Sequence, residues 1–245
     1  MNKAPRRAVR RAVVPLAAGL ALDAVPGSRG AHAADKLIRG AGATFPAPLY
    51  LTWVAQFEQA HPSVAVDYDA VGSGEGVSRF IAGSVDFAAS DAAMTDEQIA
   101  NVPGGVRMVP ATAGLVSIIY NLPGLAAPLE LPRDVLASIF MGEVTEWDDP
   151  AIVAANPGAA LPSRTIALIA RPDGSGSTFA LTNHLSAISD ARKAKHGAAT
   201  RIDWPGRTML MRGNEGVAGR VLQTEYSIGY AELGFASLLG LQMAA

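Results

Sequence analysis

The sequence contains no cysteine, and this absence excludes several kinds of site at once. A chain without thiols forms no disulfide, offers no thiol nucleophile or thiolate metal site, and carries no lipid on an N-terminal cysteine. Its stability must therefore come from the hydrophobic core alone. Histidine is almost as scarce, with four in 245 residues. Because serine nucleophiles need an adjacent base, few catalytic pairs are available to this chain.

Long apolar runs are also missing, apart from one short stretch near the N-terminus. Residues 1–33 combine a basic start, an apolar stretch at residues 13–22 and the small-residue pattern Ala31-His32-Ala33 before Ala34. This arrangement is typical of a secretory signal peptide, and its apolar stretch is too short to span a bilayer. We therefore expect export to the periplasm, while the paired arginines leave the choice between the general and the twin-arginine route open.

Positive charge is scarce after the predicted signal peptide. Residues 34–245 hold 14 Lys and Arg against 21 Asp and Glu, which gives a net charge of −7. Nucleic acid is therefore not an expected partner, because it is attracted to basic surfaces. An anionic ligand would have to be held by local dipoles and hydrogen bonds against this overall charge.

What the sequence does contain is a repeated order of short strand, small-residue turn and helix. This order is the signature of βαβ units, and it predicts an α/β fold with a mostly parallel sheet. In such sheets, ligands gather beyond the carboxyl ends of the strands. Strand patterns lie at residues 37–40, 64–68, 85–91, 114–120, 166–170 and 227–230, and helical patterns at 49–60, 77–81, 132–141, 178–185 and from 213 onward. Among the aromatic residues, we expect Trp53, Phe57, Phe87 and Tyr120 in the core.

Three runs of small and hydroxyl residues each stand directly before a helical pattern. They are residues 43–46 (Ala-Thr-Phe-Pro), 72–76 (Gly-Ser-Gly-Glu-Gly) and 173–178 (Asp-Gly-Ser-Gly-Ser-Thr). A helix start exposes backbone N–H groups without internal acceptors, and the helix dipole places about half a positive charge there. Glycine lets a ligand approach the backbone closely, and Ser and Thr hydroxyls add donors. Together with Asp91 and Arg171, the three runs predict an anion-binding site.

These segments, in this order, resemble the phosphate-binding proteins of bacterial phosphate ABC importers. The resemblance covers nearly all of residues 40–236 and is carried by the segments at 40–48, 85–91, 156–158 and 228–230. It implies a type II periplasmic-binding-protein fold, in which two α/β lobes joined by crossing strands enclose the ligand.

The resemblance also sets the expected domain organisation. We expect a signal peptide at residues 1–33, a first lobe at 34–111 and a second lobe at 112–245, with residues 110–120 as the best candidate for a crossing strand. Members of the family continue well beyond the strand at 228–230. The C-terminal part of the first lobe is therefore expected to be missing from this chain.

The ligand contacts implied by the resemblance can be carried over position by position. They are Thr44, Phe45, Ser73, Asp91, Arg171, Ser175, Gly176 and Ser177. Ser177 stands where most of the family has threonine, and it keeps the hydroxyl.

Two of these residues have roles that follow from their chemistry. Arg171 is suited to a bidentate grip on two phosphate oxygens, and Asp173 is expected to hold its guanidinium in place. The carboxylate of Asp91 repels an anion unless the ligand brings a proton to donate. Phosphate brings such a proton near neutral pH and sulfate does not, so Asp91 is expected to select phosphate.

The expected function is that of a monomeric receptor, not an enzyme, that uses no cofactor or metal and hands inorganic phosphate to membrane permease subunits. Asp148-Asp149 is interpreted as a solvated turn, because no cluster of hard ligands accompanies it. One alternative ligand is another tetrahedral oxyanion, such as sulfate or molybdate, although Asp91 argues against fully ionised anions.

A secreted hydrolase is the second alternative, with Ser73 or Ser175 as its nucleophile. Such an enzyme needs a base. The candidates after the signal peptide are His61, His184 and His196, and neither serine lies in a G-x-S-x-G elbow. This alternative is therefore the less favoured one.

Overall fold

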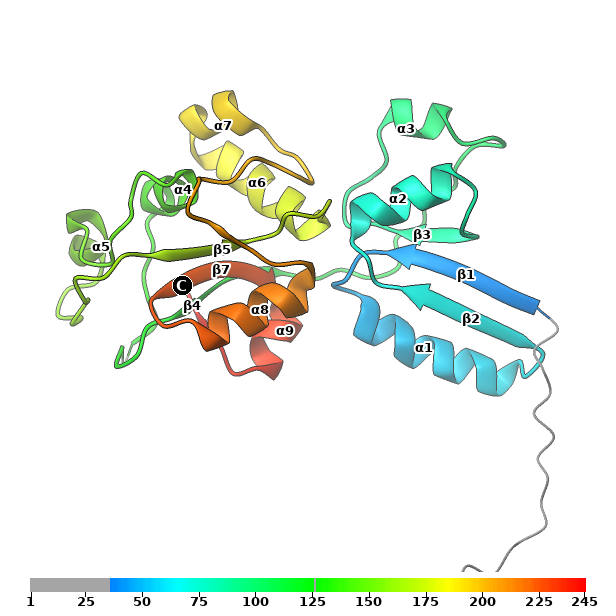
Figure 1. Cartoon of the computed structure of the whole chain (residues 1–245), viewed down its shortest axis with the longest axis horizontal. Helices are drawn as coiled ribbons and strands as arrows, with labels where there is room; N and C mark the ends of the chain where they lie inside the picture. The colour runs from blue at the N-terminus through cyan, green and yellow to red at the C-terminus, as the bar shows by residue number, and fades with distance from the viewer. Residues whose placement is uncertain (1–35, 126) are drawn as a thin grey trace, which may run out of the picture. The chain divides into compact units, whose positions relative to one another are not determined.

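The computed structural model describes residues 36–125 and 127–245, and residues Ala33–Ala245 form one compact unit. Two sheets organise this unit, one of three strands in the order β2-β1-β3 and one of five in the order β6-β5-β7-β4-β8 (Figure 1). The α/β class predicted from the sequence is confirmed. Within the described ranges, no helix has the length and apolar character needed to cross a bilayer. The predicted signal peptide lies outside the described residues.

The three-stranded sheet is entirely parallel, as the βαβ pattern predicted. Because β2 and β3 flank β1 on opposite sides, the two right-handed crossovers run in opposite directions and place α1 and α2 on opposite faces. Figure 1 shows these two helices on either side of the sheet. The elements are β1 (Lys36–Gly42), α1 (Ala47–Ala60), β2 (Val64–Asp69), α2 (Ser73–Ile81) and β3 (Phe87–Ala89), followed by α3 (Asp96–Ala100).

The five-stranded sheet is mixed, which differs from the predicted mostly parallel arrangement. β5 pairs in parallel with β6 and β7, whereas β4 pairs antiparallel with both β7 and β8. A hydrophobic strand pattern indicates that a strand is buried but not in which direction it runs, so the sequence could not predict that β4 is antiparallel. The strands are β4 (Val116–Asn121), β5 (Ala167–Ala170), β6 (Met209–Leu210), β7 (Ser227–Glu232) and β8 (Gln242–Met243).

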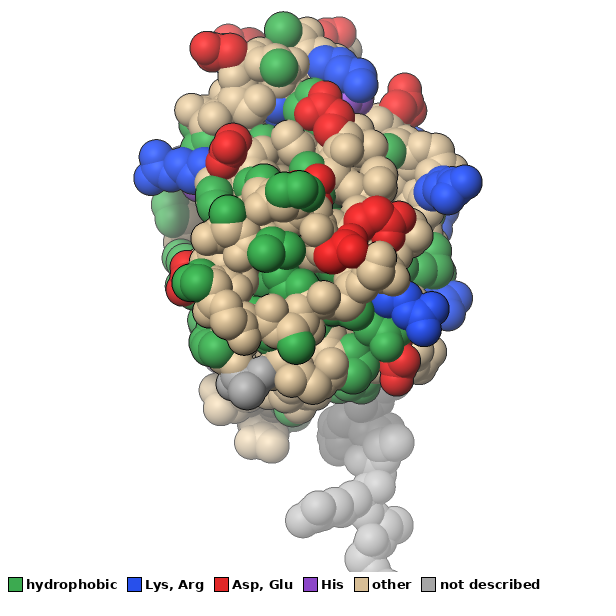
Figure 2. All heavy atoms as spheres, turned by 90° about the vertical axis from the view of Figure 1, so that its left-hand side faces the viewer, with side chains coloured by type: hydrophobic (Ala, Val, Ile, Leu, Met, Phe, Trp, Pro, Cys, Tyr) green, Lys and Arg blue, Asp and Glu red, His purple; other side chains and the backbone are tan. Residues whose placement is uncertain are grey.

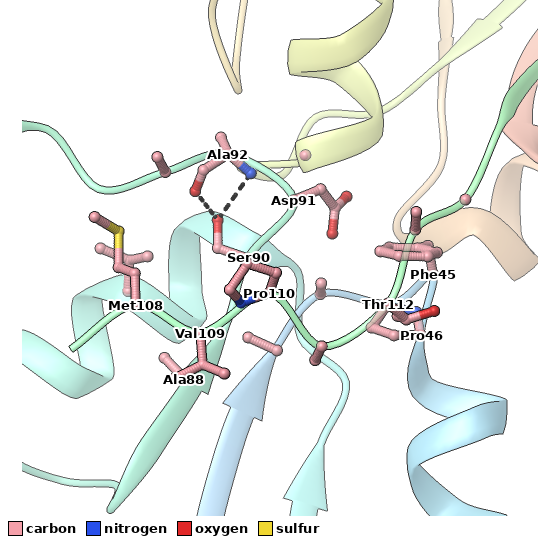
Figure 3. Close-up of a pocket in the computed structure, with 18 of the residues that line it drawn as sticks. Phe45, Pro46, Ala88, Ser90, Asp91, Ala92, Met108, Val109, Pro110 and Thr112 are labelled. Carbon is pink, nitrogen blue, oxygen red and sulfur yellow. Dashed lines mark hydrogen bonds between the residues drawn. The ribbon is translucent and has the colours of Figure 1, made fainter.

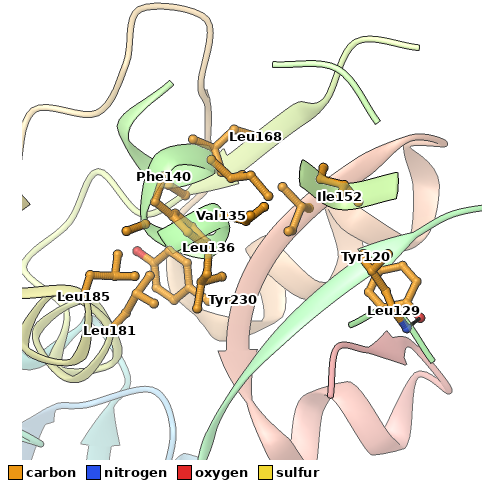
Figure 4. Close-up of a cluster of buried hydrophobic side chains, with 14 of the residues drawn as sticks. Tyr120, Leu129, Val135, Leu136, Phe140, Ile152, Leu168, Leu181, Leu185 and Tyr230 are labelled. Atoms are coloured by element: carbon orange, nitrogen blue, oxygen red, sulfur yellow. Dashed lines mark hydrogen bonds between the residues drawn. The ribbon is translucent and has the colours of Figure 1, made fainter. Parts of the chain in front are cut away.

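Helices cover both faces of the five-stranded sheet and bury two apolar clusters. Alternation along a strand sends neighbours to opposite faces: Ile119 packs with α8 and α9, while Tyr120 belongs to the cluster beneath α4 and α6. The larger cluster is shown in Figure 4 and also contains Phe140 and Tyr230. The helices are α4 (Arg133–Met141), α5 (Pro150–Ala155), α6 (Gly176–Ile188), α7 (Asp190–His196), α8 (Gly213–Gln223) and α9 (Leu233–Leu238).

Two of the four aromatic residues predicted for the core are exposed. Tyr120 is buried and Phe87 is half-buried, but Trp53 and Phe57 on α1 are 43% and 41% exposed. Within the described residues, α1 packs on its sheet through one face only, and no further layer covers the other. The predicted boundary between lobes, at residues 111 and 112, falls in the linking segment 106–115 and stays a prediction.

Candidate functional site

The candidate site is assembled where strands end. Thr44 follows the end of β1, Ser73 follows β2 as the first residue of α2, and Asp91 follows β3. Arg171 directly follows β5 of the other sheet. Parallel strands end at the same edge of a sheet, so Thr44, Ser73 and Asp91 gather at one edge of the three-stranded sheet. Arg171, from the end of a strand in the five-stranded sheet, meets them there.

Direct hydrogen bonds join the residues of the two sheets. The Nη1 of Arg171 donates to the Oγ1 of Thr44 at 3.3 Å, and the backbone N–H of Gly176 donates to the Oγ of Ser73 at 3.2 Å. Thr44, Ser73 and Arg171 are all buried. The structure therefore brings all three hydroxyl-rich turns to one site, as the sequence predicted, while their roles as ligand contacts stay a prediction.

Two glycines allow this close approach. The backbone N–H of Gly74 donates to the carbonyl of Gly174 at 2.8 Å. A Cβ built on Gly74 would lie 2.8 Å from the Cα of Gly174, which is closer than two carbon atoms can approach without displacement of one backbone. The contact therefore requires glycine on both sides.

Replacing Gly74 with alanine is expected to push the two helix starts apart and to lower oxyanion affinity by about ten- to a hundredfold, because displacements near 1 Å carry costs of this order. Gly206→Ala is the matched control, since a Cβ at Gly206 meets nothing within 4 Å. Phosphate titration of both purified variants measures this loss of affinity. Equal affinities in the two variants would show that the close contact between Gly74 and Gly174 is not needed for binding.

Arg171 is held rigidly from three directions. Its Nε donates to the Oδ1 of Asp173 at 3.0 Å, and its Nη2 forms a second, short contact with Oδ2 of the same carboxylate. The indole N–H of Trp204 donates to the Arg171 carbonyl at 2.9 Å, and the Arg171 N–H donates to the hydroxyl of Tyr230 at 3.2 Å. The Nη1 side of the guanidinium is thereby directed toward Thr44, at the centre of the site.

Asp91 places a carboxylate against the same helix start. Its backbone N–H donates to the Oγ of Ser73 at 3.4 Å, and a Cβ on Gly176 would lie 2.1 Å from its Oδ2. Figure 3 shows the side chain directed into a cavity. Although the carboxyl group is open to this cavity, desolvation by the surrounding protein raises its pKa to about 6. The charge of Arg171 and a hydrogen bond from Ser73 oppose this rise in pKa.

Helix starts supply backbone donors beside the guanidinium. Ser175 caps α6 by accepting the N–H of Thr178 on its Oγ at 3.1 Å. The next amides of a first turn have no acceptor within the helix. Ser177 lies in the first turn of α6, and Phe45 lies in the turn just before Pro46, the N-cap of α1. Among the described residues, neither the N–H of Ser177 nor that of Phe45 donates to another group of the protein. Both amides are therefore free to bind an anion.

Asn214 is a site residue that the sequence reasoning missed. At the start of α8, its backbone N–H and Nδ2 donate to the Oγ1 of Thr44 at 3.3 and 2.8 Å. Its Oδ1 accepts from the hydroxyl of Ser177 at 3.4 Å and from the N–H of Glu232 at 3.0 Å. The Gly-Asn-Glu-Gly run at residues 213–216 is a fourth small-residue helix start, and this feature of the sequence could have indicated that α8 also contributes to the site.

Tyr230 and Trp204 were also missed as parts of the site. The Tyr230 hydroxyl lies 2.5 Å from the Oγ1 of Thr178, and burial raises the pKa of this phenol to about 12. It therefore stays protonated and able to donate. No local pattern marks either residue as part of the site, because Tyr230 lies in an ordinary buried-strand pattern and Trp204 in a loop.

The described residues offer no support for a metal centre or a hydrolase. Across these ranges there is no group of three or more His, Cys, Asp or Glu side chains that could hold a metal ion. Asp149 caps α5 by accepting the N–H of Ala151 at 2.9 Å. The Oγ atoms of Ser73 and Ser175 accept backbone N–H groups, and no histidine in the described part hydrogen-bonds to either serine.

The sequence and the fold both match known proteins. The family model described as a PBP superfamily domain matches residues 27–245. The chain belongs to the PBP superfamily. Its sequence is 42% identical to the phosphate-binding protein PstS of Pasteurella multocida and 41% identical to PstS of Haemophilus influenzae, each over 200 residues and 81% of this chain. These matches confirm the resemblance to the phosphate-binding family.

The matches differ in how much of each relative they cover. The chain spans 57% and 59% of the lengths of these two PstS proteins. Among solved structures, a phosphate-binding protein from Stenotrophomonas maltophilia superposes with a TM-score of 0.61 at 20% identity, over 80% of this chain and 60% of that one. This superposition confirms the binding-protein fold.

Proposed function

We propose that this protein binds inorganic phosphate in the periplasm and delivers it to an ABC-type import permease. The observation that carries the proposal is the convergence of hydroxyls, free helix-start amides and the buried guanidinium of Arg171 around the carboxylate of Asp91. The names of the PstS relatives, which describe them as phosphate-binding proteins, support the same ligand and a binding role rather than an enzymatic one.

The donors present match what a buried phosphate needs. An anion removed from water requires partners for its oxygens, because desolvation without them is prohibitive. Thr44 and Ser73 offer hydroxyls, Phe45 and Ser177 offer backbone amides, and Arg171 can grip two oxygens at once. No metal or cofactor is needed for this binding.

Asp91 is proposed to discriminate between phosphate and sulfate. At about 4 Å and an effective dielectric constant near 20, each pair of like unit charges costs about 4 kcal/mol. A carboxylate acceptor left without a donor adds about 1–3 kcal/mol. Protonated phosphate donates a hydrogen bond to Asp91 and removes the second cost, whereas sulfate suffers both. Because both anions feel the repulsion, the difference between them is the second cost together with the hydrogen bond that phosphate gains, worth about 1.5–3 kcal/mol. The two amount to about two to four orders of magnitude in affinity.

The raised pKa of Asp91 predicts a pH-dependent loss of this discrimination. Below pH 6 the carboxyl group is mostly protonated in the free protein, so it no longer repels sulfate and can donate to it. Sulfate affinity should therefore rise by about tenfold for each pH unit as the pH falls from 8 toward 6, and then level off. Sulfate titrations between pH 5 and pH 8 measure this rise, and an affinity that does not change with pH would contradict the role of Asp91.

The charge on the protein surface indicates which macromolecules the protein can bind. Figure 2 shows Lys and Arg side chains separated from one another among Asp, Glu and uncharged groups on the face it displays, which does not resemble a nucleic-acid surface. We propose that the permease recognises the phosphate-loaded protein as a monomer after removal of residues 1–33.

Equilibrium dialysis of the purified chain against radiolabelled phosphate tests the proposed function. The expected result is saturable retention of one phosphate per chain at pH 7.5, with no displacement by a large excess of sulfate. A chain that melts cooperatively but retains no phosphate would overturn the proposal.

A further inference from the structure

A second buried arginine lies outside the proposed phosphate site. Arg192 is in α7, which packs against α6 (Figure 1). The residue is fully buried, although its sequence neighbours Ala191 and Lys193 are exposed. A guanidinium carries five N–H donors and stays charged in proteins, so it needs acceptors wherever water is excluded.

Only one nitrogen of this guanidinium has a partner among the described residues. Nη1 donates to the carbonyl of Gly197 at 3.1 Å, whereas Nε and Nη2 are buried and hydrogen-bond to no residue of the described ranges. None of the ion pairs within the described part of the chain includes Arg192. Burial lowers the pKa of the guanidinium. A buried cation without a counter-charge is costly, and a bound water or ion can supply the missing acceptor.

Arg171 shows what the same two nitrogens bind elsewhere in this chain. Its Nε and Nη2 both contact the carboxylate of Asp173, one at each oxygen. These nitrogens lie on one edge of the guanidinium plane, and their parallel N–H groups match two oxygens carried by one atom. Arg192 presents the same edge, so its geometry favours a planar oxyanion over a single-atom anion such as chloride.

A further donor is available on α6. The Oγ of Ser186 is also buried and has no hydrogen-bond partner among the described residues. Ser186 lies about one helical turn after Thr182, whose Oγ1 bonds to both backbone groups of Ala199 at 3.0 Å. Ser186 therefore lies on the side of α6 that faces the segment following α7, the same segment that Arg192 contacts at Gly197.

The local charge is positive, although the chain after the predicted signal peptide is acidic overall. Residues 191–201 contain four Lys and Arg and no Asp or Glu. Burial, together with the charges of Arg192 and Lys195, lowers the pKa of His196, and Asp203 only opposes this effect. An anion is therefore attracted to this corner between α6, α7 and the segment that follows.

We propose that Arg192 binds a small carboxylate through its Nε and Nη2 atoms, at a second site that is separate from the phosphate site. Because Arg192 is fully covered, the ligand must be small, and formate is the smallest carboxylate. Local opening of a seven-residue helix is enough to admit it. The bound anion supplies the missing counter-charge and stabilises the packing of α7 on α6. None of the proposed phosphate contacts takes part, so this proposal does not depend on phosphate binding.

Formate titration of the isotope-labelled full chain, followed by NMR at the Nε–H resonance of Arg192, tests the carboxylate site. The loss of this resonance in Arg192→Met assigns it. Formate should shift it saturably, with half the change reached at about 1–10 mM, the range expected for two charge-assisted hydrogen bonds. Sodium chloride at equal ionic strength should give no saturable shift. Equal responses to both salts, a response to sulfate but not to formate, or no saturable response would overturn the proposal.

Thermal melts of two variants locate the ligand. At 100 mM, formate should raise the Tm of the unaltered chain by about 3–10 °C relative to chloride, because binding to the folded state stabilises it. Arg192→Met should lose this gain, and without formate it should melt no lower than the unaltered chain, since an apolar side chain replaces an unpaired buried charge. Arg201→Met, at an exposed arginine of the same segment, is the matched control and should keep the gain. An equal gain in Arg192→Met would refute the site.

Discussion

Replacing Arg171 with alanine is expected to lower phosphate affinity by about two to four orders of magnitude. The substitution removes two charge-assisted hydrogen bonds to the ligand, each worth about 1.5–3 kcal/mol. The structure supports this role because Asp173 fixes the guanidinium, Trp204 and Tyr230 hold the Arg171 backbone, and the Nη1 atom is directed toward Thr44. Calorimetric titration with phosphate measures the loss.

The control for this prediction separates binding from stability. Removal of Arg171 leaves the buried Asp173 without its partner, and breaking such a pair costs about 3–5 kcal/mol of stability. The double variant Arg171→Ala, Asp173→Ala removes both charges and should regain part of the lost stability without regaining phosphate affinity. If the double variant bound phosphate as tightly as the unaltered protein, Arg171 would not be a ligand.

Replacing Asp91 with asparagine is expected to raise sulfate affinity at pH 8 by at least about two orders of magnitude. The amide carries no charge to repel the anion and offers a donor where the carboxylate offers only acceptors. Phosphate affinity should fall, because a good acceptor for its proton is lost. Competition titrations with both anions measure the change in selectivity, and the pH dependence of sulfate binding should disappear in the same variant.

Asp86→Asn provides the matched control for this substitution. Asp86 lines the same cavity, but its carboxylate accepts the backbone N–H of Arg39 at 2.7 Å. The Asp86→Asn substitution changes the net charge by the same amount as Asp91→Asn, so any change in sulfate affinity caused by overall charge appears in both variants. A variant at Asp91 that still excluded sulfate as strongly as the unaltered protein would refute selection by this carboxylate.

The parts of the site that the sequence predicted are those defined by local chemistry. Ser73 and Ser175 stand at helix starts because glycine and hydroxyl residues interrupt one element and cap the next, and these preferences act within a few residues. Arg171 directly follows β5 and Asp91 follows β3 after one residue, so the strand pattern placed each at the carboxyl end of a strand, where ligands gather in α/β sheets. These two strand ends belong to different sheets, and their meeting depends on contacts between distant segments.

The parts that the sequence did not predict depend on contacts between distant segments. Asn214 reaches Thr44 across 170 positions, and the small-residue run around it marks a helix start without showing what that helix start contacts. The exposure of Trp53 and Phe57 depends on what packs over α1, which a helical pattern cannot report. The antiparallel direction of β4 was also not predictable from the sequence, because the alternation of apolar residues is identical in parallel and antiparallel strands.

Calorimetric titration of phosphate and then sulfate into the purified, phosphate-free chain at pH 8 is the most direct test of anion selection by Asp91. One phosphate should bind per chain, with no measurable binding of sulfate at the same concentrations, because ionised Asp91 accepts only an anion that carries a proton. Equal binding of the two anions, or binding of neither to a folded chain, would contradict this selection.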